Sequence, residues 1–158
     1  MLGNQLYYPT FALLILTLVI IFVPRREIRK LFWFSLFWGS TVDAFLIILF
    51  RVMNLFYYEQ LEPFNFLGAP MWIPLAWSPA IILLIYFFPD RKEWYYQAFY
   101  ITAFSMVGVG VGLFFKQAGL IKEVHWNGFL RLPLHVVWFY GAVKHHRYLE
   151  ATEEDSLK

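Results

Sequence analysis

Three ionisable residues lie inside long apolar runs of this sequence: Asp43, Arg131 and His135. A charged group at the centre of a membrane helix costs roughly 2.5 to 3.5 kcal/mol, so such residues are rare and mark candidate functional sites. Asp43 lies twelve residues after Leu31, and Arg131 lies twelve residues before Val143. At a rise of 1.5 Å per helical residue, both would lie roughly 18 Å from the same face of a membrane. His135 follows Arg131 by four residues and shares its helical face.

Two interpretations of these residues stay open. In the first, Asp43 and Arg131 form a buried ion pair that fixes the packing of two helices, and His135 adds a hydrogen bond. In the second, the three residues line a small polar cavity for an anionic or quinone-like ligand, or form a proton path.

Bound haem and bound metal are not expected. A b-type haem in a helical bundle usually takes two axial histidines from facing helices, and only His135 lies well inside an apolar run. His125, His145 and His146 fall at the ends of runs, and adjacent residues such as the last two point about 100° apart on a helix. The chain has no cysteine, which excludes disulfides and thiolate ligands.

Gly108 and Gly112 form a G-x-x-x-G pattern within one apolar run. Two glycines one helical turn apart let a second helix approach closely. We expect a packing contact here, made either within the chain or with a partner subunit.

Two carboxylates and a histidine lie between the apolar runs, on the side expected to be outside: Glu59, Glu62 and His125. Carboxylates near a histidine suit acid–base chemistry or cation binding. The alternative is that all three are ordinary solvated loop residues.

The composition predicts a membrane protein. Of the 158 residues, 60% are apolar and 22% are aromatic, far above the roughly 45–50% apolar content of soluble domains. The formal net charge of +2 is too small to indicate a nucleic-acid partner. Membrane lipids are therefore the expected surroundings of most side chains.

The order of apolar runs predicts an all-α bundle of about five transmembrane spans in a single domain, residues 1–149. A polar tail, residues 150–158, is expected to be disordered. The last run is short and contains Arg131, so four spans are the alternative. The first run is read as a retained span because a basic turn follows it, without a cleavage site. The expected spans lie near residues 6–23, 31–50, 68–88, 94–115 and 128–143.

The distribution of lysine and arginine predicts the orientation, because the richer side of a membrane protein is cytoplasmic. The N-terminus would lie outside and the C-terminus in the cytoplasm, which makes the chain a multi-pass protein of the cell membrane. The basic residues of the cytoplasmic side are Arg25, Arg26, Arg29, Lys30, Arg91, Lys92, Lys144, Arg147 and Lys158, and those of the outer side are Arg51, Lys116 and Lys122.

From residue 23 to residue 148 the chain resembles small multi-span membrane proteins of unknown function found in spore-forming Firmicutes. The resemblance rests on loose patterns: the Pro-Arg-Arg turn before an aromatic-rich run with Asp43, a proline-bearing third run that ends in Tyr-Phe-Phe-Pro, and Leu-Ile followed by Trp126. Many of those proteins carry a glutamate in the fourth span, where this chain has no carboxylate. The resemblance implies the topology and no particular activity.

Two classes of function follow from the sequence. The first is a non-enzymatic assembly, accessory or lipid-binding component, which works by contact with other membrane subunits or with a second copy. The second is a small membrane enzyme or carrier for a lipid-soluble ligand, or a proton path, built on Asp43, Arg131 and His135.

Overall fold

A computed structural model of the chain describes residues 3–63, 65–91 and 93–156. The described part is mostly helical, as the all-α prediction requires. The helices are η1 (Asn4–Leu6), α1 (Tyr7–Phe22), α2 (Arg25–Ser35), the π-helical segment η2 (Leu36–Thr41), α3 (Val42–Val52), α4 (Trp72–Tyr86), α5 (Trp94–Gln117) and α6 (Gly128–Ser156), and the short strands are β1 (Phe56–Tyr58), β2 (Asn65–Phe66), β3 (Ala69–Pro70) and β4 (Ile121–Glu123).

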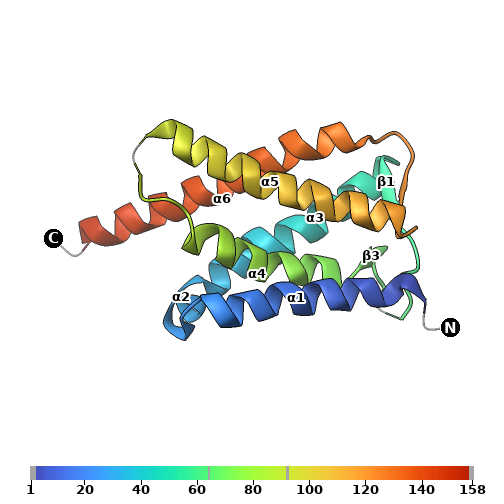
Figure 1. Cartoon of the computed structure of the whole chain (residues 1–158), viewed down its shortest axis with the longest axis horizontal. Helices are drawn as coiled ribbons and strands as arrows, with labels where there is room; N and C mark the ends of the chain where they lie inside the picture. Colours follow the sequence, from blue (N-terminus) through green and yellow to red (C-terminus); the bar gives the residue numbers. More distant parts are fainter. Residues whose placement is uncertain (1–2, 64, 92, 157–158) are drawn as a thin grey trace.

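Each expected span corresponds to a helix or to a continuous helical rod, and the long rods run roughly along one direction (Figure 1). Two of them, Arg25–Val52 and Trp94–Gln117, are long and apolar enough to cross a membrane. Helices α1 and α4 are equally apolar in character but shorter, with 16 and 15 residues.

Two segments differ from the expectation at the ends of helices. The basic cluster after Pro24 forms the first turns of α2, so the turn itself is confined to Val23 and Pro24. A proline just before a helix is favourable, because its fixed φ angle suits the first turn and its missing N–H would have no partner there.

The second difference is the polar tail, which continues α6 to Ser156 instead of being disordered from residue 150. Residues 149–151 are good helix formers, and the segment contains no glycine or proline that would stop the helix. Glu150 also pairs with Lys30 of α2 at 3.2 Å and with His146 at 3.4 Å. These pairs attach the extension to the rest of the molecule.

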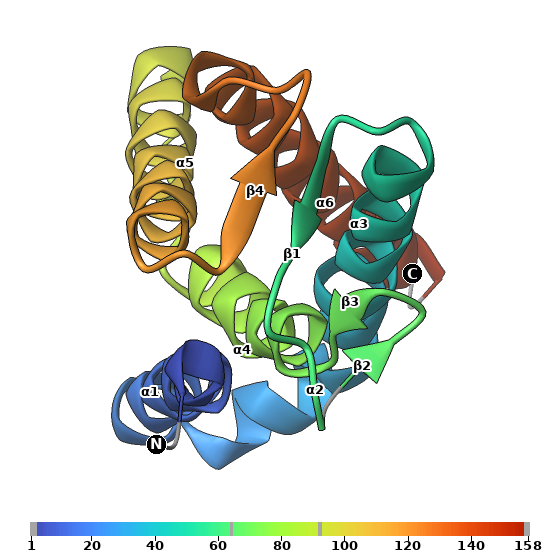
Figure 2. The same cartoon turned by 90° about the vertical axis from the view of Figure 1, so that its right-hand side faces the viewer.

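Helix α4 lies at the centre, between α1 on one side and α3, α5 and α6 on the others (Figure 2). Most of its side chains are buried, including Pro74 and Pro79. A central position suits such a helix, because neighbouring elements can satisfy the backbone groups that proline leaves free.

A very close helix contact brings η2 against α4. A Cβ atom on Gly39 would lie 2.5 Å from backbone atoms of Trp77 and Ser78, so only glycine fits. Ser40 Oγ donates to the Pro74 carbonyl at 2.9 Å, and Ser78 Oγ donates to the Ser35 carbonyl at 3.0 Å. Serine hydroxyls thus satisfy backbone carbonyls next to the π-helical segment, where the helical hydrogen bonding is irregular.

The connections expected to be plain loops form a small cap at one end of the helices. Strands β1 and β4 pair antiparallel, with Phe56 opposite Glu123 and Tyr58 opposite Ile121. The Tyr8 hydroxyl, 3.0 Å from the Leu120 carbonyl, joins α1 to this cap. The pairing fixes the position of Glu123.

Candidate functional site

A cavity of about 50 Å³ lies next to the cap, between α3, α5, α6 and β1. The three ionisable candidates from the apolar runs all line it: Asp43 from α3, and Arg131 and His135 from α6. Their exposed fractions are 7%, 6% and 8%, so each is held away from the surface. The structure therefore brings the predicted polar cluster to one place.

Asp43 and Arg131 do not form the expected ion pair. Among the described residues, the carboxylate that pairs with Arg131 belongs to Glu123, with Nη2 and Oε1 3.1 Å apart. The equal depth predicted for Asp43 and Arg131 assumed that the helices end near Leu31 and Val143, and both continue further. Counted from their cap ends, Asp43 lies nine residues in and Arg131 only three, a difference of roughly 9 Å.

Glu123 pairs with a predicted site residue but was not singled out by the sequence analysis, because it lies in a connection between two apolar runs. Its carboxylate also accepts a hydrogen bond from Lys116, at the end of α5. Burial by itself raises the pKa of Glu123, but the hydrogen bonds and positive charges of Lys116 and Arg131 outweigh burial and hold this pKa below its ordinary value. The sequence held one signal: a carboxylate only eight residues before a buried arginine.

Asp43 is left without a counter-ion in the described part of the chain, and its buried Oδ2 has no hydrogen-bond partner. Two buried donors on the cavity wall are also unpartnered, Arg131 Nε and Trp126 Nε1. Unsatisfied buried polar atoms are rare in folded proteins and usually indicate an ordered water or another bound group. One acceptor and two donors thus belong to residues around the same small space.

His135 has one defined hydrogen bond. Its Nδ1 lies 2.7 Å from the Arg131 carbonyl, which can only accept, so Nδ1 carries the proton. In the neutral ring Nε2 is then an acceptor. The ring packs against Trp77, Trp138 and Phe139 at centroid distances of 5.6, 6.0 and 5.6 Å.

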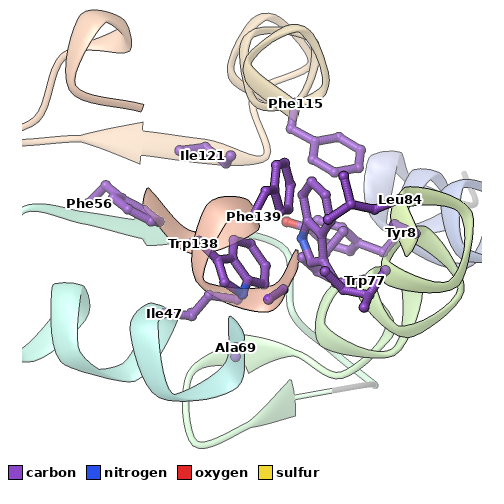
Figure 3. Packing of buried hydrophobic residues seen from close by; sticks show 14 of the residues in the cluster. Tyr8, Ile47, Phe56, Ala69, Trp77, Leu84, Phe115, Ile121, Trp138 and Phe139 are labelled. Carbon is purple, nitrogen blue, oxygen red and sulfur yellow. The ribbon is translucent and has the colours of Figure 1, made fainter. Parts of the chain in front are cut away.

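Trp77 and Trp138 also line the cavity, and Figure 3 shows them beside Phe139 in the buried aromatic cluster. Trp138 stacks on Phe139 at 5.2 Å and donates its indole N–H to the Trp38 carbonyl at 2.8 Å. Bulky aromatic side chains therefore form part of the cavity wall.

Gly108 and Gly112 face α6 within the chain. A Cβ on Gly108 would lie 2.7 Å from Cδ2 of His135, and one on Gly112 would lie 2.2 Å from Nη1 of Arg131. The G-x-x-x-G face therefore makes room for the two polar side chains of the site.

The other three candidates lie apart from this cavity. Glu62 and His125 are exposed, and Glu59 is half-buried, with its backbone carbonyl accepting the Tyr8 hydroxyl at 2.7 Å. The structure does not assemble them into one site with Asp43. Within the described residues, no group of three histidine or acidic side chains is placed to hold a metal ion.

No family model matches the chain, and comparisons with curated proteins and with solved structures find no similar protein. The resemblance to small membrane proteins of spore-forming Firmicutes therefore stays a prediction, and the function is inferred from the cavity and its surroundings.

Proposed function

We propose that the chain is a multi-pass protein of the cell membrane, with five spans and the cap outside. Large apolar side chains are exposed along the rods, among them Ile20 and Ile21 on α1 and Phe99 on α5, as expected for helices that face lipid. The basic residues gather at the opposite end, where α1 passes into α2 and α4 leads to α5 (Figure 1). The positive-inside rule then makes that end cytoplasmic.

Within this placement, we propose that the protein takes up and releases a proton at Asp43, reached from the cap side through a hydrated cavity. The observation that carries the proposal is the convergence of unpartnered polar atoms on a water-sized space. An unpaired buried carboxylate is costly, and a bound proton removes that cost. A cavity of about 50 Å³ has room for a few water molecules.

A proton fits this site better than a quinone-like ligand or a metal ion. The volume is too small for a quinone ring, and a metal cation would meet the positive charge of Arg131 with a single unpaired carboxylate to hold it. Of the two functional classes open from the sequence, the geometry also disfavours assembly through the glycine face, because α6 already occupies Gly108 and Gly112.

Infrared spectroscopy of the protein in lipid nanodiscs tests the proposal. Between alkaline and acidic buffer, we expect the carbonyl band of a buried protonated carboxylic acid to appear in the wild type and to be lost in Asp43→Asn. Asp90→Asn is the matched control, because Asp90 is an exposed acid between α4 and α5 that lies outside the cavity. A band that persists unchanged in Asp43→Asn would show that the proton binds elsewhere.

A further inference from the structure

A second recess lies between α5 and α6, at the end of the bundle opposite the cap. The two helices diverge toward this end (Figures 1 and 2), and the groove between them has a volume of about 330 Å³. Its walls are mostly apolar and include Ile101 from α5 and Val136, Tyr140 and Val143 from α6. Trp94 also lines the groove and is 77% exposed, as is typical of tryptophan at the level of lipid headgroups.

Two cations, Lys144 and Arg147, line the same groove. They are three residues apart, so they share one face of α6. Neither forms an ion pair with a carboxylate in the described part of the chain. Lysine and arginine side chains without acidic partners are available to an anion.

Arg147 is held in place by neutral groups. Its guanidinium lies over the Phe88 ring at 4.7 Å, and Nη1 donates to Gln97 Oε1 at 3.1 Å. These contacts use one of its five N–H donors and leave the planar edge of the guanidinium for a phosphate. Lys144 lies 5.7 Å from the centre of the Tyr140 ring, on the same groove.

We propose that this groove binds one anionic phospholipid of the cytoplasmic leaflet. Lys144 and Arg147 hold its phosphate group, and an acyl chain lies along the apolar wall beside Ile101 and Val136. Basic pockets between helices on the cytoplasmic side are suited to anionic headgroups. The site rests on the proposed membrane placement and is independent of proton binding at Asp43.

The test is native mass spectrometry of the full chain in mild detergent with equal amounts of phosphatidylglycerol and phosphatidylcholine. The wild type should retain phosphatidylglycerol in preference to phosphatidylcholine. Lys144→Ala/Arg147→Ala should weaken this preference roughly 10- to 30-fold, from about 1 kcal/mol for each cation near the membrane surface. Arg26→Ala/Arg29→Ala is the matched control, because it removes two exposed arginines with the same spacing that do not line this groove, and it should keep the preference.

A second variant tests the groove separately from its charge. Ala98 is an exposed residue on the α5 wall, and Ala98→Trp fills the groove while both cations stay in place. It should reduce retention of either lipid.

Three outcomes would overturn the site: equal retention of both lipids by the wild type, equal loss in the two double variants, or a protein partner or second copy in the groove in place of lipid. A wild type recovered from the soluble fraction of lysed cells would overturn the membrane placement and the lipid site with it. Asp43→Asn should bind lipid like the wild type, so loss of the infrared band leaves this proposal standing.

Discussion

At the scale of single residues, the site is organised by one carboxylate that serves two cations. Glu123 accepts from both Lys116 and Arg131, so Arg131 has no need of Asp43 as a counter-ion. Because both cations pair with Glu123, Asp43 lies beside the cavity without a counter-ion among the described residues. This makes Asp43 the residue most suited to the proposed proton binding.

Acid should weaken the fold through Glu123. The pKa of Glu123 is lower in the folded protein than its ordinary value of 4.5, so the stability that it contributes is complete above that value and is lost as the pH falls through the lower, folded value. Thermal unfolding of the protein in detergent between neutral and acidic pH measures this loss.

The variant Glu123→Gln separates the contribution of Glu123 to stability from that of other acids that titrate over the same pH range. At neutral pH it should be less stable than the wild type by about 3 kcal/mol, because Arg131 stays buried without its carboxylate. The difference should shrink as the pH falls. Glu62→Gln is the control, since Glu62 is exposed and bonds only to Asn65 in the described structure; equal pH dependence in the wild type and Glu123→Gln would contradict the assignment.

At the scale of elements, the rod from Arg25 to Val52 positions Asp43 through its contact with α4. The π-helical segment η2 ends at Thr41, so Asp43 lies in the first turn of α3 immediately after it. The hydrogen bonds of Ser40 and Ser78 and the close approach at Gly39 hold this segment against the central helix. The contact between η2 and α4 therefore sets the direction in which the Asp43 side chain leaves its helix.

Gly39→Ala should destabilise the protein by about 1 to 3 kcal/mol, because the added Cβ would meet backbone atoms that cannot move aside. Gly110→Ala is the matched control within α5, where a Cβ meets nothing within 4 Å. It should be neutral or stabilise the helix by up to about 1 kcal/mol. Denaturation in detergent compares the two; equal effects would show that the contact between η2 and α4 is not a constraint.

At the scale of the whole molecule, the two ends of the bundle differ in structure and in charge. One end carries the cap of strands and the cavity, and the other carries the basic residues and the groove between α5 and α6 (Figure 1). In the proposed membrane orientation, the two proposed sites would lie on opposite sides of the membrane, and each would be reached from its own side.

The orientation can be checked by labelling, because the natural chain has no cysteine. We expect a cysteine in Glu62→Cys to react with a membrane-impermeant maleimide in intact cells, and one in Asp90→Cys to react only after permeabilisation. Both positions are exposed and lie on either side of α4. The reverse pattern would invert the topology, and labelling of both from outside would remove α4 as a span.

The sequence by itself determined the number and approximate limits of the helical rods. These follow from local properties: long apolar runs predict the helices, and the polar segments between the runs predict the connections. The same local pattern singled out Asp43, Arg131 and His135, because ionisable residues within apolar runs are conspicuous. The polar composition of the tail led to the wrong prediction that it is disordered. The structure continues α6 to Ser156, and Glu150 pairs with Lys30 and His146.

Only the tertiary structure decided which charges meet. Helix ends cannot be located from hydropathy to within a turn, and an error of a few residues in a helix limit shifts a side chain along the helix axis by several ångströms. Glu123 reaches Arg131 because β4 pairs with β1, and that pairing joins segments about 65 residues apart. Which carboxylate pairs with a buried arginine depends on contacts between segments that are distant in the sequence, so a local sequence pattern cannot predict it.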